Sequence, residues 1–170
     1  ASNIKGIVHP VLDCRLYSGG LQMEAEISVS VVIFRDESIL FVKDMQTRDK
    51  HRLVLPGGRL QGNERIEECA VRRAREASGI AIELDRNLGG IITSIGSREN
   101  YPITFVLIGE AAGGTLFSDA VFLPYRYIER YGSVSDFSGL VIRNLKDSTF
   151  SSMVRSEFVS AEGNRYRAYF

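Results

Sequence analysis

The chain has 170 residues, of which 44% are hydrophobic and 25% are charged. This length is enough for one compact domain with a core and too short for two domains of ordinary size. Lysine plus arginine and aspartate plus glutamate balance at 21 each, so the overall charge gives no general attraction to nucleic acid or to an anionic membrane. Cys14 and Cys69 are far apart and lack metal-ligand spacing, which excludes a disulfide framework. The longest apolar runs have the length of strands, and the first residues do not resemble a signal peptide. We therefore expect no membrane partner and a cytoplasmic location, or an organelle matrix if a transit segment was removed.

Strands are predicted for the first part of the chain. Residues 4–16 alternate loosely and contain Pro10, which predicts an extended arm or edge strand over residues 1–20. Residues 24–34 and 39–43 are rich in β-branched side chains and flank a polar turn, which predicts a β-hairpin.

A short strand over residues 53–55 is predicted to precede a helix. Asn63 is a suitable N-cap, Glu64 would then lie in the first turn, and Gly79 is a natural stop. The predicted core face consists of Ile66, Ala70, Val71, Ala74 and Ala77. The residues predicted to point away are Arg65, Glu68, Arg72 and Arg75.

The remaining chain is predicted to mix strands and helices without a regular repeat. The predicted strands cover residues 80–84, 90–94, 101–109 and 121–123, the helices cover 125–130 and 135–145, and a hairpin covers 159–170 with its turn at Glu162-Gly163. This order predicts an α/β (α+β) fold in which a mixed β-sheet lies between helices. One domain is expected over residues 21–147, and residues 148–170 are expected to form a strand or hairpin extension packed on it.

Two glycines follow the short strand, and each has a functional and a structural explanation. Gly57 and Gly58 allow the backbone to approach a ligand closely, and the amides before a helix can face an anion. An ordinary turn between a strand and a helix explains them equally well. In the helix, Arg72 is spaced to pair with Glu68 and Glu76, so a salt-bridged amphipathic helix is the plainer interpretation of its charges.

Together these residues resemble the Nudix box: Gly, five residues, Glu, seven residues, Arg-Glu, an aliphatic, any residue, Glu-Glu, any residue, Gly, an aliphatic. The positions that match are Gly58, Glu64, Arg72, Glu76 and Gly79. The preceding Leu-Pro-Gly-Gly is also typical of the family. The resemblance implies the Nudix fold over about residues 24–145. The candidate ligand-binding residues are Gly57, Gly58, Arg59, Arg73 and Tyr101.

The box departs from the family at its metal-binding positions. In the family, several carboxylates of the box helix bind Mg²⁺ or Mn²⁺, which activates water for attack on a diphosphate. The three main positions hold Arg73, Glu76 and Ala77 here, so the resemblance leaves Glu76 and Gly57 as metal ligands. If the protein is active with Mg²⁺ or Mn²⁺, the implied catalytic residues are Glu76, Arg72 and Glu64. Arg73 is spaced to pair with Glu76, and a guanidinium neutralises phosphate charge but does not generate hydroxide, so ordinary hydrolysis is expected to be lost or weak.

Residues outside the box offer partial alternatives. Asp119 or Glu110 would have to reach in from later parts of the chain to rebuild a metal site. Residues 56–61 also resemble the GDP-mannose mannosyl hydrolase branch, in which an arginine at the position of Arg59 stabilises the leaving diphosphate. That branch uses a histidine base in a loop that corresponds to residues 94–101, and no histidine is present there. Only the role of Arg59 is therefore carried over.

Three hypotheses remain open. In the first, the protein binds a nucleotide or an RNA 5′ phosphate in the Nudix cleft, with Tyr101 as the candidate for stacking on a base. In the second, it is a Mg²⁺-dependent hydrolase of an NDP-sugar, ADP-ribose or a dinucleotide with a rearranged site. In the third, it is a scaffold whose cleft binds nothing. The alternating basic and aromatic residues 164–170 fit RNA stacking or, more simply, an edge strand that pairs within the chain, with a protein partner or in a homodimer.

Overall fold

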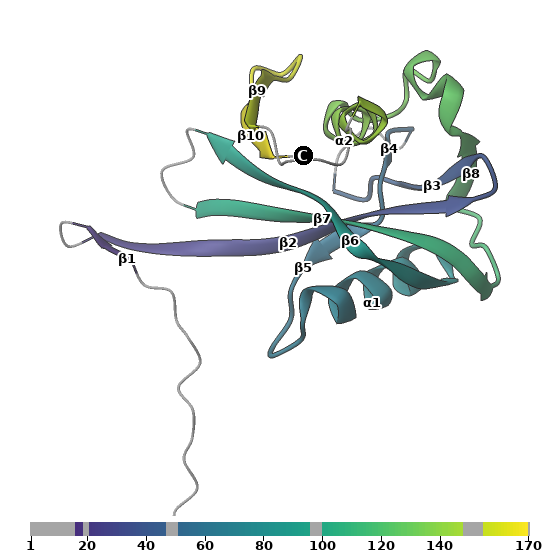
Figure 1. Cartoon of the computed structure of the whole chain (residues 1–170), viewed down its shortest axis with the longest axis horizontal. Helices are drawn as coiled ribbons and strands as arrows, with labels where there is room; N and C mark the ends of the chain where they lie inside the picture. The colour runs from purple at the N-terminus through teal and green to yellow at the C-terminus, as the bar shows by residue number, and fades with distance from the viewer. Residues whose placement is uncertain (1–15, 19–20, 47–50, 96–99, 148–154, 170) are drawn as a thin grey trace, which may run out of the picture.

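A mixed β-sheet forms the centre of the molecule, with a helix on each face (Figure 1). The structure is a computed structural model that describes residues 16–18, 21–46, 51–95, 100–147 and 155–169. The strands are β1 (Leu16–Ser18), β2 (Leu21–Arg35), β3 (Ser38–Lys43), β4 (Leu53–Val54), β5 (Gly57–Arg59), β6 (Ile80–Ile95), β7 (Asn100–Gly114), β8 (Ala120–Pro124), β9 (Arg155–Val159) and β10 (Arg165–Tyr169). The helices are α1 (Ile66–Ser78), the 3-10 helix η1 (Tyr125–Arg130) and α2 (Asp136–Asp147). Of the arm or edge strand predicted over residues 1–20, residues 16–18 form β1, which pairs with β2, and the others lie outside the described residues.

The strand order along the sheet is β4-β3-β2-β7-β6-β10-β9. β2 runs parallel to β7, from Glu24 opposite Asn100 to Phe34 opposite Glu110, whereas β6 and β7 are antiparallel. The predicted hairpin of β2 and β3 is confirmed, but only the two register pairs nearest the turn join these strands. Nearer its N-terminal end, at residues 28–30, β2 pairs with β5 instead. Residues 28–30 of β2 and residues 42–43 of β3 line one cavity.

Two predicted elements differ from the structure. The predicted strands over residues 80–84 and 90–94 are one strand, β6, whose pairing with β7 shifts between Leu84 and Leu88 and again before Gly90. The polar stretch between them therefore forms bulges rather than a loop, because β-bulges absorb extra residues without ending the strand pairing. Residues 125–130 form a 3-10 helix rather than an α-helix.

Helix α1 begins later than predicted. Its N-cap is Arg65 and not Asn63, and Glu64 precedes the helix instead of lying in its first turn. The Glu68 carboxylate accepts a hydrogen bond from the Arg65 backbone N–H at 2.8 Å. An acidic side chain of the first turn thus provides the partner for a backbone N–H at the start of the helix. The predicted stop is confirmed, since Gly79 caps the C-terminus with a left-handed φ of 78° that suits glycine.

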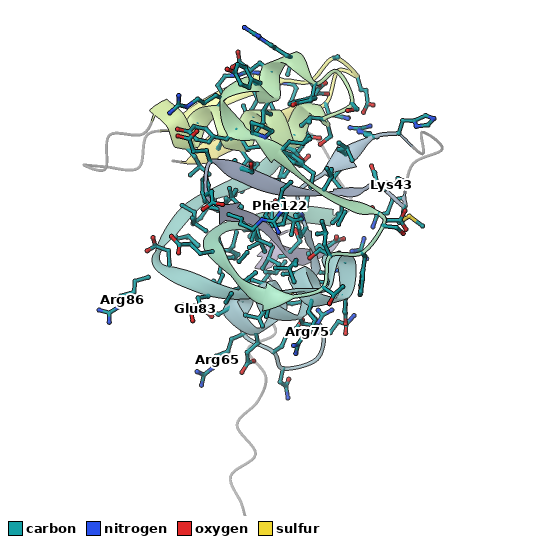
Figure 2. All side chains as sticks on the ribbon, turned by 90° about the vertical axis from the view of Figure 1, so that its right-hand side faces the viewer. Lys43, Arg65, Arg75, Glu83, Arg86 and Phe122 are labelled. Carbon is teal, nitrogen blue, oxygen red and sulfur yellow. The ribbon has the colours of Figure 1, made fainter. Side chains whose placement is uncertain are left out.

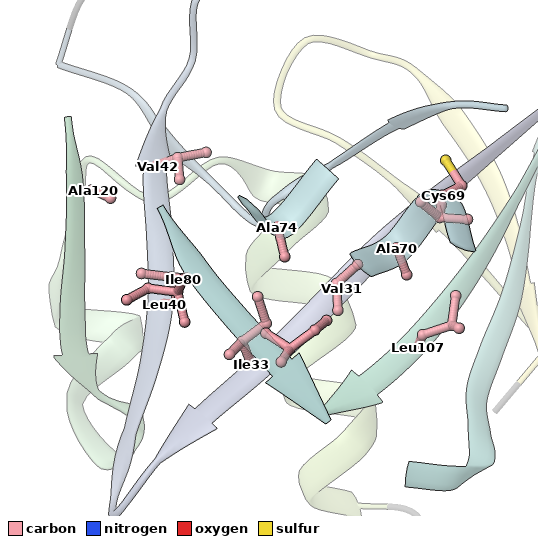
Figure 3. Packing of buried hydrophobic residues seen from close by; sticks show 12 residues of the cluster. Val31, Ile33, Leu40, Val42, Cys69, Ala70, Ala74, Ile80, Leu107 and Ala120 are labelled. Carbon is pink, nitrogen blue, oxygen red and sulfur yellow. The ribbon is translucent and has the colours of Figure 1, made fainter. Parts of the chain in front are cut away.

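The core consists of two apolar clusters, one against each helix. The cluster against α1 includes Val31, Ile33, Leu40, Ala70, Ala74 and Leu107 (Figure 3). The cluster against α2 includes Val32, Phe41, Ile92, Val106 and Val141. The predicted face of α1 is partly wrong, because Val71 is 41% exposed while Cys69 is fully buried. The helix presents Cys69, Ala70 and Ala74 to the sheet, and this orientation leaves Val71 outside the contact.

The predicted C-terminal hairpin is confirmed. β9 and β10 pair across a turn that contains Gly163, whose φ is 84°. β10 also pairs with β6, from Arg165 opposite Ile95 to Tyr169 opposite Ile91, so the hairpin extends the central sheet. Val159 ends its first strand, whereas the sequence predicted that the hairpin begins there. No helix among the described residues is long and apolar enough to cross a membrane.

Candidate functional site

The loop after β4 is held against β2. Gly57 lies opposite Ser30, and the Pro56 carbonyl accepts a hydrogen bond from the Val31 N–H at 2.8 Å. A side chain at Gly57 would overlap the Val29 carbonyl oxygen and would lie 3.1 Å from the Cα of Ser30. Glycine is therefore required here by the close approach of two backbones. The predicted loop is in fact the short strand β5.

Glu64 and Arg72 form a two-pronged ion pair. Arg72 donates from Nε to one Glu64 oxygen at 2.9 Å and from Nη2 to the other at 2.6 Å. The Gln61 N–H donates to the same carboxylate at 2.7 Å. The hydrogen bonds from Arg72 are the main reason that the pKa of Glu64 falls to about 2, because they favour the ionised form.

This pair makes the predicted outward orientation of Arg72 wrong. Only 22% of its side chain is exposed, since the Glu64 carboxylate draws the guanidinium towards the loop. Arg72 Nη2 also donates to the Arg59 carbonyl at 3.3 Å. The pair therefore holds the connection between β5 and α1 in place. Arg65 and Arg75 are exposed on α1, as predicted, and lie on its outer side (Figure 2).

Arg73 contacts both of the predicted metal ligands. Its Nε donates to the Gly57 carbonyl at 2.6 Å, and its Nη1 donates to a Glu76 oxygen at 3.1 Å. The predicted pairing of Arg73 with Glu76 is thus confirmed. The same Glu76 oxygen also accepts from Arg72 Nη1 at 3.0 Å. The Gly57 carbonyl oxygen and one of the two Glu76 carboxylate oxygens are therefore already bonded to guanidinium groups.

The residues of this site do not fit an ordinary divalent cation. Mg²⁺ and Mn²⁺ require several oxygen ligands, but Ala77 has none to offer and Glu64 is bound to Arg72. A fixed positive charge at Arg73 also opposes a second cation beside it. Among the residues that the structure describes, no group of three His, Cys, Asp or Glu side chains is arranged to hold a metal ion.

A cavity of about 880 Å³ lies beside these contacts. The charged residues that line it are Glu26, Lys43, Asp44, Arg52, Arg59, Arg73, Glu76 and Asp119. Arg59 pairs with Glu26 at 2.5 Å, and Lys43 pairs with Asp119 at 3.2 Å. The predicted residues Gly57 and Gly58 also line the cavity, and Glu110 is not among the described lining residues. A cavity of this size accommodates a ligand built of several groups.

The structure identifies cavity residues that the sequence did not single out. Phe117 lines the cavity with 49% of its surface exposed, and its ring packs against the backbone at Gly79. Phe137 of α2 and Arg52, the residue before β4, also line it. Tyr101 is the residue predicted to stack on a base, and its side chain lies outside those described. No motif marks Phe117, because its position depends on how the segment after β7 folds back onto α1.

Comparison with known proteins identifies the fold. The fold resembles a NUDIX hydrolase from Nitrosomonas europaea (TM-score 0.62, 19% identity, 73% of this chain and 90% of that one) and a mutator MutT protein from Bacillus halodurans (TM-score 0.62, 14% identity, 84% and 97%). These likenesses define the Nudix fold. The family model described as NUDIX domain matches residues 25–121. The chain therefore belongs to the Nudix family.

One relative carries a named activity. The chain is 28% identical over 96 residues to an "ADP-ribose pyrophosphatase" of Methanocaldococcus jannaschii, a match that covers 56% of this chain and 57% of that protein. The chain thus spans little more than half the length of this relative. Helix α2 and the hairpin β9–β10 lie beyond the residues that the family model matches.

Proposed function

We propose that this Nudix domain binds the diphosphate of a nucleotide derivative in its cavity, with Arg73 in the place of a divalent cation, and that ordinary metal-dependent hydrolysis is lost or weak. The observation that supports this proposal is the contact of Arg73 with the Gly57 carbonyl and with Glu76. These two contacts engage two of the five N–H donors of a guanidinium. Because 34% of the Arg73 side chain is exposed, the other donors are accessible to a ligand.

The chemistry of a guanidinium suits binding better than hydrolysis. Arginine offers a planar set of donors that matches two phosphate oxygens. It does not lower the pKa of a bound water in the way that a divalent metal does. Since half-exposed ion pairs contribute only about 0–1 kcal/mol, a phosphate can replace Glu76 on Arg73 at little cost. Arg59, which lines the same cavity and pairs with Glu26, supplies a second cation.

ADP-ribose is the first ligand to test. The named activity of the relative concerns this compound, and it combines a diphosphate with two further groups, as the cavity volume of about 880 Å³ allows. GDP-sugars, diadenosine phosphates and 5′-triphosphate RNA complete the panel. A domain that binds none of these compounds would instead support a purely scaffolding role.

The experiment is calorimetric titration of ADP-ribose into the full chain in the presence of EDTA. We expect binding without metal, and we expect Arg73→Gln to weaken it by about tenfold because one charge-assisted phosphate contact is lost. Arg75→Gln is the matched control, since Arg75 is exposed on the same helix and its variant should bind like the wild type. Equal affinity in wild type and Arg73→Gln would contradict the proposal.

A second candidate is a Mg²⁺-dependent hydrolase with a rearranged site. Asp119 favours it, because this carboxylate lines the same cavity as Glu76. The test is turnover of ADP-ribose and of an NDP-sugar with excess Mg²⁺. Metal-dependent turnover that is lost in both Glu76→Gln and Asp119→Asn would support this candidate and overturn the first.

A further inference from the structure

A second cavity, of about 590 Å³, lies between the C-terminal hairpin, α2 and the segment that contains η1. β9 and α2 lie side by side above the sheet (Figure 1). The lining comes from residues 128–136, from α2 and from residues 158–161, all of which lie beyond the residues that the family model matches. Among the described lining residues, only Ser135 also lines the cavity beside Arg73. This second cavity, the hairpin groove, is therefore separate from the box.

The backbone of Val159 faces the open edge of the hairpin. In an antiparallel pair, residues that exchange hydrogen bonds with the partner strand alternate with residues whose backbone groups face away. The Ser160 N–H donates to the Asn164 carbonyl at 2.9 Å, so Ser160 and Phe158 face β10 and Val159 faces away from it. Among the described strands, only β10 pairs with β9. The N–H and the carbonyl of Val159, a residue that lines the groove and is 64% exposed, are thus oriented to pair with a further strand.

The wall of the groove opposite β9 has open space beside its backbone. Gly132 and Gly139 line the groove, and a Cβ at either position would meet no atom within 4 Å outside its own stretch of backbone. Gly139 lies within α2, where alanine would favour the helix more. The adjoining lining is apolar and includes Ile128, Leu140 and Phe158. A side chain that enters the groove here can approach the helix backbone and pack against these residues.

The charges of the groove favour a basic occupant. Its described charged lining residues are Glu129, Asp136 and Arg143, two carboxylates and one guanidinium. Arg143 and Glu129 are 3.8 Å apart, and their side chains are 62% and 69% exposed, so their pairing is weak. Asp136 accepts a hydrogen bond from the Ala161 N–H at 3.0 Å, and this neutral donor does not cancel its charge. A basic side chain in the groove is therefore favoured over an acidic one.

The groove suits a lone extended segment better than a second copy of this chain. Two β9 strands that pair around a two-fold axis form one sheet, and the axis is perpendicular to that sheet. Both α2 helices would then lie on the same face, where each already borders its own β9. The two helices would compete for the space of the groove. A lone segment brings only its own side chains into that space.

We propose that the hairpin groove binds an extended segment of another protein, which adds to β9 as a strand at Val159. Strand addition of this kind derives its affinity from backbone hydrogen bonds and its specificity from every second side chain. The side chains that point towards α2 are apolar beside Gly139 and basic beside Asp136. This role is independent of the ligand that binds near Arg73.

The test uses the isotopically labelled full chain and a blocked peptide, Thr-Val-Thr-Lys-Thr-Val-Thr, in which valine and lysine share one face. An NMR titration at about 50 mM salt should give a dissociation constant below about 1 mM, with the largest shifts at the amides of Val159 and Gly139. Replacing the lysine of the peptide by glutamate should weaken binding by about fivefold, and about 0.5 M salt should reduce this difference.

Val159→Pro is the decisive variant. Proline removes the outward N–H but none of the hydrogen bonds to β10, so the hairpin should persist, and affinity for the lysine peptide should fall by at least about tenfold. Val159→Thr keeps the N–H and the β-branched shape, and this matched control should bind within about twofold of the wild type. Gly139→Leu fills the open space beside α2 and should also weaken binding by about tenfold.

Three results would each overturn the proposal: no binding of the lysine peptide to the wild type at about 5 mM, equal affinity of Val159→Pro and the wild type, or equal affinity for the lysine and glutamate peptides. A wild-type dimer in sedimentation that Val159→Pro dissociates would also overturn it, because a second copy would then occupy the edge. If circular dichroism shows that Val159→Pro is unfolded, Gly139→Leu decides, and unchanged affinity in that variant overturns the proposal.

Discussion

Replacing Gly57 by alanine should destabilise the domain and disturb the site at the same time. The added methyl group would overlap the Val29 carbonyl oxygen and lie 3.1 Å from the Cα of Ser30 and 3.2 Å from the carbonyl carbon of Val29. These are backbone atoms of the central strand β2, so no flexible side chain can move aside. The contact must be relieved by moving β5 away from β2.

The size of the effect follows from this geometry. An extra methyl in a tightly packed place costs about 1–3 kcal/mol, and we take about 2 kcal/mol for Gly57→Ala. A domain of this size loses roughly 2–4 °C of Tm per kcal/mol, so Tm should fall by about 4–8 °C. The displaced β5 would also carry the Gly57 carbonyl away from Arg73, so affinity for ADP-ribose should fall as well.

The assay is thermal unfolding followed by circular dichroism, with Gly132→Ala as the control. A methyl group at Gly132 meets no atom within 4 Å, so that variant should melt within about 1 °C of the wild type. A Gly57→Ala protein that melts with the wild type and binds ADP-ribose equally well would refute the close approach of β5 and β2.

Three further predictions concern single residues. Because Arg72 lowers the folded-state pKa of Glu64 to about 2, the ionised carboxylate stabilises the fold above its ordinary pKa, and this stability should be lost as the pH falls from about 5 to about 2. Urea unfolding across this range should show that the free energy of unfolding depends less on pH in Glu64→Gln than in the wild type. The same pH dependence in both proteins would contradict the ion pair. The pKa of the Cys69 thiol is raised to about 11, mainly by burial. In a Cys14→Ser variant, a disulfide reagent should therefore leave Cys69 unlabelled at pH 8 when the protein is folded and should label it in denaturant. Rapid labelling of the folded variant would argue against the burial of Cys69. Gly139 lies within α2 with open space around its Cα, so Gly139→Ala should raise the free energy of unfolding by roughly 0.5–1 kcal/mol, and a destabilised variant would show that the helix differs there.

The sequence predicted the fold because its main signals are local. The alternation in β2 and β3, the glycine stop at Gly79 and the box spacing each involve neighbouring residues. Helix boundaries were less predictable, because Arg65 rather than Asn63 became the N-cap once Glu64 was bound to Arg72. An ion pair formed over eight residues thus outweighed the local capping preference.

The sequence predicted contacts of the site only for residues within the box motif. The spacing of Arg73 and Glu76 predicted their pairing, which the structure confirms. The contact of Arg73 with the Gly57 carbonyl joins residues sixteen positions apart, and it depends on how β5 lies on β2. Phe117 and Phe137 line the cavity through tertiary packing, and no spacing rule connects them to the box.

Binding of Mn²⁺ tests the proposal that Arg73 occupies the position of the divalent cation. Calorimetry should detect no specific Mn²⁺ binding by the wild type at millimolar metal, whereas the double variant Arg73→Glu with Ala77→Glu should bind Mn²⁺, since it restores carboxylates at both altered positions. Circular dichroism would show that the double variant is folded. Wild-type Mn²⁺ binding that disappears in Glu76→Gln, or a folded double variant that gains no affinity for the metal, would contradict this role of Arg73.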